Sequence, residues 1–128
     1  MKMKLLVLLI LAIPILSNAQ SAKPIFKIGF LGTPRIWAPD FRNVENATIE
    51  MSDFSKSDYQ IKEFTVTVLS DKTKTYKTIK NVGSKLNTEI RGMFSTLSSN
   101  DVILIDGIII TDSKEKNTYL TERVFRVR

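Results

Sequence analysis

Residues 86–111 constrain the fold most, because their apolar pattern changes from helical to extended across one short polar turn. Asn87 or Thr88 is placed to cap the first helical turn. The run 102–110 is rich in β-branched residues on both alternating faces, which predicts a central strand covered on both sides. A short helix over about residues 87–98 therefore precedes that strand. Its apolar stripe has intervals of three and four residues: Ile90, Met93, Phe94 and Leu97.

The rest of the chain is read mainly as strands. The clearest alternation places Phe64, Val66 and Val68 on one face of residues 61–68. Residues 74–82 have mixed faces and several lysines, which is typical of an edge strand. Three further segments read as extended: 24–31, 48–51 and 119–127.

Two proline-containing segments, Gly32–Pro34 and Ala38–Asp40, predict turns, because proline fixes its own φ and disfavours helix in the residue before it. About seven extended segments and one short helix predict a mostly β fold. The simplest arrangement is an immunoglobulin-like β-sandwich with the helix in one connection. A single sheet with the helix on one face is the alternative.

The first residues predict a secretory signal peptide. Lys2 and Lys4 precede an apolar run over residues 5–16, and Ser17 and Ala19 are small residues at the first and third places before a cleavage site. A membrane anchor is the competing interpretation, but the apolar run is shorter than the roughly 20 residues that a spanning helix needs. We therefore expect cleavage after Ala19, a single domain over 20–128, no membrane span and a periplasmic or secreted location.

Composition excludes most familiar hydrolase designs. The chain has no cysteine and no histidine, so it has no disulfide, no thiolate nucleophile, no His-ligated metal and no Ser-His-Asp arrangement. Asp53, Asp101 and Asp112 fall at predicted turns, where an aspartate side chain commonly accepts hydrogen bonds from the local backbone. The spacing of the aspartates matches no calcium loop. We predict a protein that is not an enzyme and that has no cofactor and no metal.

The basic charge is mild. The net charge of +6 includes Lys2 and Lys4, so removing the signal peptide leaves about +4. The one basic concentration, Lys72 to Lys80, lacks the interleaved aromatic residues of a nucleic-acid reader. Lysines on an exposed strand discourage pairing between edges, which is the simpler interpretation. Nucleic acid is not expected as a partner.

Candidate partner-binding residues lie in the predicted loops. Trp37 stands between two prolines and could anchor a partner or a sugar ring, although filling the core is the favoured role for an indole. The loops 53–58 and 112–117 are polar connections, the first with one aromatic residue inside it. The predicted partner-binding residues are Trp37, Asp53, Phe54, Asp58 and Lys114.

Several segments together resemble a known family. They are a Pro24-x-x-x-x-Gly29 opening, the acidic-aromatic turn within 47–54, the strand 61–68, the helix opening Thr88-Glu89-Ile90, and the turn and strand over 97–111. In this order they resemble the C-terminal periplasmic domain of GldM, a component of the gliding-motility and type IX secretion machinery of Bacteroidetes.

The chain departs from that family in three respects. Asn100 stands where the family favours glycine, a change that asparagine tolerates because it also visits the left-handed region. The glycine-rich stretch near the start is reduced to Gly29 and Gly32. The transmembrane helix and long periplasmic region of the full motor protein have no counterpart, so the resemblance implies a module for protein contact and not the motor role.

The expected function is therefore an exported, non-enzymatic protein-binding or structural module of the cell envelope, accessory to a secretion or gliding-type complex and bound to an envelope protein. The alternative is a small carbohydrate-binding protein that uses an exposed platform of Trp37, Tyr59 and Tyr76. Self-association through the exposed edge is a third reading, and the lysines of that edge oppose it.

Overall fold

A computed structural model describes residues 22–29 and 35–128. The predicted signal peptide and the predicted Gly32–Pro34 turn lie outside these residues. Within them, no helix is both long and apolar enough to cross a bilayer. The elements in chain order are β1 (Pro24–Ile28), β2 (Arg35–Ile36), α2 (Ala38–Arg42), β3 (Ala47–Met51), β4 (Gln60–Leu69), β5 (Tyr76–Val82), α3 (Thr88–Ser95), β6 (Val102–Thr111), β7 (Asn117–Leu120) and β8 (Arg123–Val127).

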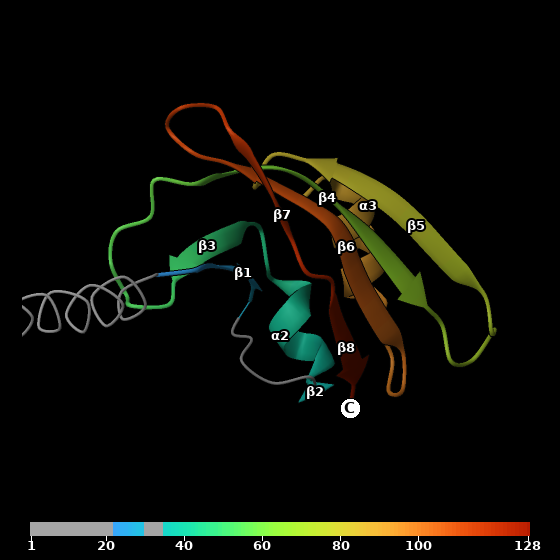
Figure 1. Ribbon diagram of the computed structural model, residues 1–128. Coiled ribbons are helices and arrows are strands. Elements are labelled where there is room, and N and C mark those ends of the chain that lie inside the picture. The colour runs from blue at the N-terminus through green and yellow to red at the C-terminus, as the bar shows by residue number, and fades with distance from the viewer. Residues whose placement is uncertain (1–21, 30–34) are drawn as a thin grey trace, which may run out of the picture.

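The strands form one large sheet and one small sheet (Figure 1). The large sheet has six strands in the order β2-β8-β6-β4-β5, and β7 pairs with β6 beyond the end of β8. Its pairs are antiparallel except for β2 with β8. The small sheet is the antiparallel pair β1-β3. The predicted strands 61–68 and 74–82 are confirmed as β4 and as the edge strand β5.

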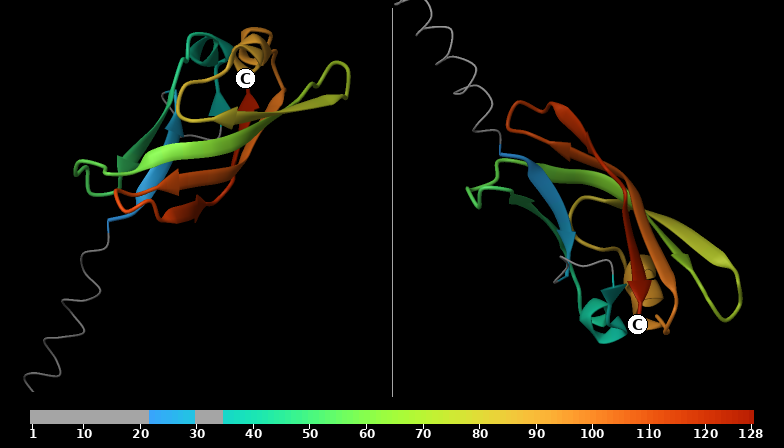
Figure 2. Two further views of the ribbon diagram at one scale, coloured as in Figure 1. Left: turned by 90° about the horizontal axis from the view of Figure 1, so that it is seen from above. Right: turned by 60° about the horizontal axis from the view of Figure 1, so that its bottom comes forward.

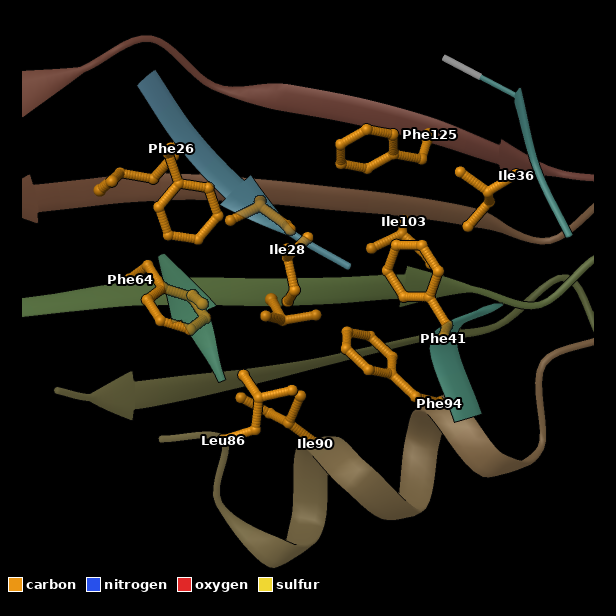
Figure 3. Packing of buried hydrophobic residues seen from close by; sticks show 14 of the residues in the cluster. Phe26, Ile28, Ile36, Phe41, Phe64, Leu86, Ile90, Phe94, Ile103 and Phe125 are labelled. Carbon is orange, nitrogen blue, oxygen red and sulfur yellow. The ribbon is translucent and has the colours of Figure 1, made fainter. Parts of the chain in front are cut away.

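The small sheet and both helices cover one face of the large sheet, which we call the inner face (Figure 2). Phe26 of β1 meets Phe64 of β4 edge to face, with ring centroids 5.1 Å apart. Phe41 of α2 meets Phe94 of α3 at 5.0 Å in the same geometry. Figure 3 shows these rings and aliphatic side chains from both layers pointing into one core. The chain is therefore mostly β and sandwich-like, with a second layer that is part sheet and part helix.

Helix α3 begins and packs as predicted. The side-chain oxygen of Asn87 accepts a hydrogen bond from the Ile90 amide at 2.8 Å, which confirms Asn87 as the N-cap. Ile90, Phe94 and Leu97 are buried and Met93 is partly buried, so the predicted stripe faces the sheet. The helix spans Thr88–Ser95 and ends before the predicted residue 98.

The prediction that residues 102–110 are covered on both sides is wrong. Residues 103, 105, 108 and 110 are buried on the inner face, whereas Val102 and Leu104 lie on the other face and are only partly buried. Gly107 has φ +57° and lies where the register between β6 and β4 shifts, so β6 has one extra residue there. This bulge moves the buried positions of β6 from odd-numbered residues before it to even-numbered residues after it. The second apolar face of β6 therefore has no layer over it within the described chain.

Two further local predictions need correction. The Ala38–Asp40 turn is the first part of the short helix α2, because proline is well accommodated in a first helical turn, where its missing amide costs no hydrogen bond. The single strand predicted over 119–127 is divided into β7 and β8, and Thr121 lies in the break between them. Both pieces pair antiparallel with the same edge of β6 and in the same register, so the break lies opposite the bulge at Gly107.

Candidate functional site

The open face of the large sheet, which we call the outer face, carries an apolar surface at one end. The strand register aligns Tyr76, Leu69, Val102 and Arg126 in one row across β5, β4, β6 and β8. The next row contains Thr78, Thr67, Leu104 and Val124. Side chains at such neighbouring positions contact each other across strands. The two rows therefore form one continuous surface.

These rows enclose a shallow apolar groove of about 360 Å³. Tyr76 is 75% exposed, Val124 is 52% exposed and Leu69 is 43% exposed, so three large apolar side chains meet water side by side. Contiguous exposed apolar surface is typical of an interaction site. The sequence carried this signal in the second apolar face of 102–110, but the pattern cannot distinguish a covered face from an open one. We call this the apolar groove; its lining is Thr67, Leu69, Tyr76, Val102, Leu104 and Val124.

Charged side chains border the apolar groove. Arg126 follows Val102 in the first row and lies beside Arg35 of β2. On the other side, Lys80 pairs with Glu63 at 2.7 Å, and Asp106 lies beside Thr65. An apolar centre with a charged rim is the usual composition of a protein-binding surface.

The predicted residues Asp53, Phe54 and Asp58 lie in the β3-β4 connection. Phe54 is 84% exposed and has φ +60°, so the backbone holds its ring in solvent. The Asp53 carboxylate accepts hydrogen bonds from the Ser55 hydroxyl at 2.6 Å and from the Ser55 amide at 3.0 Å. These bonds lower the pKa of Asp53 below its ordinary value, the hydroxyl having the larger effect. The predicted turn role of Asp53 is confirmed.

Replacing Ser55 with alanine should raise the pKa of Asp53 toward the ordinary aspartate value. The variant loses the hydroxyl donor, which favours the ionised carboxylate most, and keeps the amide donor. A carboxyl-carbon NMR titration of Asp53 in the two proteins measures the shift. An unchanged Asp53 titration would show that the hydroxyl bond does not persist in solution.

Lys114 lies in the β6-β7 connection, which an aspartate organises. The Asp112 carboxylate accepts bonds from the backbone amides of Lys114 and Lys116, both at 2.9 Å. Because Gln60 pairs with Thr111, this connection and the β3-β4 connection leave the same end of the sheet. The structure thus brings four of the five sequence candidates to one end. The apolar groove lies at the other end, beside Leu69 and Val102.

Trp37 is separate from the other candidates. It directly follows β2, whose partner is the far end of β8, so it lies at the sheet end opposite the two loops. Its side chain is 56% exposed, and the Arg128 guanidinium lies 5.4 Å from the ring centroid. The interpretation of Trp37 as a core-filling residue is wrong, because its neighbours Ile36 and Ala38 are buried in the core whereas the Trp37 side chain between them is exposed.

The described residues offer little for chemistry. They contain no cluster of three acidic side chains that could hold a metal ion. One hollow, about 480 Å³ beside β3 and β4, has Tyr59 as the one ionisable side chain in its lining. The buried Asp101 accepts bonds from the Ser98 and Asp71 amides, at 2.8 and 2.9 Å, which confirms its predicted turn role.

The chain was compared with models of known families. The family model described as the GldM C-terminal domain matches residues 29–127. The matched residues therefore include every described element from β2 to β8 and the apolar groove. No curated protein matches the chain.

Proposed function

The chain belongs to the GldM C-terminal domain family, and on that premise we propose that it is an exported, non-enzymatic module that binds another protein of the cell envelope. The family name associates this domain with a gliding and secretion component, which works as a protein complex. The proposed location is the periplasm or the exterior, after removal of residues 1–19. We propose an accessory role in such a complex, because the proposed role of the domain is contact with another protein.

The observation that carries this proposal is the apolar groove. A stable domain of this size normally turns its large apolar side chains inward, yet Tyr76, Leu69 and Val124 are exposed together on a regular sheet. A flat sheet face presents a rigid surface, so binding costs little backbone ordering. The loops with Asp53, Phe54, Asp58 and Lys114 are proposed as a second contact region at the opposite end of the sheet.

The carbohydrate alternative has no such support. It needs aromatic rings on one platform, but Tyr59 precedes β4 at one end of the sheet, whereas Trp37 and Tyr76 lie at the other. Trp37 and Tyr76 are associated with opposite edge strands, β2 and β5. Four strand spacings separate those edges, roughly 19 Å.

Site-specific photo-crosslinking in native envelopes tests the proposal. A benzoylphenylalanine at Val124 or Tyr76 should give one reproducible adduct with an envelope protein, because both positions line the apolar groove. The same group at Asp40, exposed on α2, is the matched control and should give none. A fourth position, Phe54, reports separately on the loop region.

A charge placed in the apolar groove should reduce capture. Val124→Lys places a long, charged side chain at an exposed strand position and should leave the unfolding midpoint within a few degrees of the parent protein. We expect the yield of the Tyr76 adduct to fall about tenfold, because a desolvated ammonium opposes burial of the groove. If crosslinkers at Asp40 and Val124 capture the partner equally, the apolar groove is not the binding surface. The same conclusion follows if Val124→Lys leaves the yield of the Tyr76 adduct unchanged.

A further inference from the structure

Strand β5 is an edge of the large sheet that the described chain leaves unpaired. It pairs with β4 on one side, and no other described strand pairs with it. Figure 1 shows β5 at the margin of the sheet, and Figure 2 shows the β4-β5 hairpin extending past the rest of the domain. It also adjoins the apolar groove, because Tyr76 belongs to both. An unpaired edge is a template for an added strand.

The hydrogen-bond pattern shows which backbone groups face outward. The Gly83 amide donates to the Lys62 carbonyl and the Ser70 amide donates to the Thr75 carbonyl, each at 2.8 Å. Bonded positions alternate in an antiparallel pair, so the odd-numbered residues of β5 face β4. The amides and carbonyls of Tyr76, Thr78, Lys80 and Val82 point away from the sheet. Their side chains lie on the outer face.

One contact independently supports this assignment and limits the free length. The Lys80 carbonyl accepts a bond from the side-chain nitrogen of Asn87, 3.1 Å away, on the side opposite β4. The helix cap therefore occupies one outward acceptor. The free edge consists of both backbone groups of Tyr76 and Thr78 and the Lys80 amide, which is enough for a short added strand.

The charges of this edge select its occupant. Residues 70–88 contain five lysines, Lys72, Lys74, Lys77, Lys80 and Lys85, and a single acidic residue, Asp71. Asp71 pairs with Lys74 at 2.8 Å, whereas Lys72 and Lys77 make no ion pair among the described residues. A second copy of this edge would place lysines opposite lysines. An acidic segment would instead be attracted, and steered toward the edge before contact.

We infer that β5 accepts an extended acidic segment of the partner protein as an additional strand of the large sheet. The inference rests on the proposed function and specifies its partner chemistry. The segment bonds to Tyr76, Thr78 and the Lys80 amide, places acidic side chains near Lys72 and Lys77, and directs alternate apolar side chains toward Tyr76 and the apolar groove. Main-chain bonds supply affinity in this mode, and the alternating side chains supply selectivity.

Synthetic peptides test the inference on the whole chain. The probe is an eight-residue peptide that alternates glutamate and valine, and the comparison peptide has lysine in place of glutamate. We expect the acidic peptide to bind at least about tenfold more tightly, with affinity falling as salt rises. N-methylation of one alternate set of its amides should abolish binding, and N-methylation of the other set should not. Exchange of the Tyr76 and Thr78 amides should slow in the complex.

Two variants check the position. Exchanging Lys72 and Lys77 for glutamate should reverse the preference to the basic peptide. Thr78→Pro removes an outward amide without removing a backbone bond to β4, although it also loses the hydroxyl contact with Thr67, so it should weaken binding about tenfold while circular dichroism and unfolding confirm the fold. Equal affinity for the two peptides, equal effects of both methylation sets, or binding to phosphatidylglycerol vesicles in place of peptide would each overturn the inference.

This experiment and the crosslinking can fail separately. If Val124 and Tyr76 capture an envelope protein but the acidic peptide fails to protect Thr78, strand addition is wrong and the proposed function stands. If the peptide binds with the expected register but no position captures a partner in envelopes, the edge chemistry stands and the envelope role is wrong.

Discussion

Replacing Phe64 with alanine should lower the free energy of unfolding by about 4 kcal/mol. Phe64 is completely buried on β4 and packs edge to face with Phe26 of β1, so its ring joins the two sheets. Truncation removes that contact and leaves a cavity that the paired strands cannot close, because their backbone bonds hold them apart. Urea unfolding followed by circular dichroism measures this loss. In a separate thermal unfolding experiment, the midpoint temperature should fall by roughly 20 °C.

Phe54→Ala is the matched control for this prediction. It deletes the same side chain from the exposed β3-β4 connection, where the ring is 84% exposed, and should change stability by less than about 0.5 kcal/mol. Phe64→Leu keeps most of the apolar volume and should cost about 1 kcal/mol, so it remains measurable if the alanine variant fails to fold. Similar losses for Phe54→Ala and Phe64→Ala would contradict a core built between the two sheets.

The strands and helix α3 could be predicted because their signals are local. Phe64 and Val66 alternate with polar residues, and the spacing from Ile90 to Leu97 repeats with the helical period, so each pattern names its own buried face. The N-cap at Asn87 follows from the same short range. Family membership, now shown for residues 29–127, depended on the order of these segments.

The sequence did not indicate which face of each strand is covered by another layer of the fold. Leu104 and Ile105 are both aliphatic, but β1, α2 and α3 are enough to cover only one side of β6. That outcome depends on how much chain remains for a second layer, which no local pattern encodes. The bulge at Gly107 is similar, because only the pairing with β4 reveals the extra residue. The strand over residues 102–110 was therefore predicted correctly, but the prediction did not reveal the apolar groove.

Candidate residues on loops were predictable as exposed but not as neighbours. Asp53 and Lys114 are about 60 residues apart in sequence. Their loops lie at the same end of the sheet only because Gln60 pairs with Thr111. Trp37 was misjudged for a different reason. Its size favours burial, but the chain had already satisfied that end of the core with Ile36 and Phe41.

The second large effect is expected for Asn81, the one fully buried polar side chain of β5. Its nitrogen donates to the carbonyls of Gly83 and Lys85, both at 3.0 Å, and its oxygen accepts from the Asn87 amide at 2.8 Å. One side chain thus satisfies three backbone groups of the turn that leads to α3. These three bonds are partly buried, so losing the side chain leaves the backbone groups without their protein partner.

Asn81→Ala should therefore lower the free energy of unfolding by about 3 kcal/mol, more than a buried apolar truncation of the same size would. The loss should also be local: amide exchange should accelerate first at Asn87 and Ile90, because the N-cap rests on the turn that Asn81 holds. Asn117→Ala, on an exposed strand position, is the control and should change stability by less than about 0.5 kcal/mol. If exchange near Ile90 matched that of the parent protein while stability fell, the cost would come from β5 packing and not from the hydrogen bonds that join β5 to the helix.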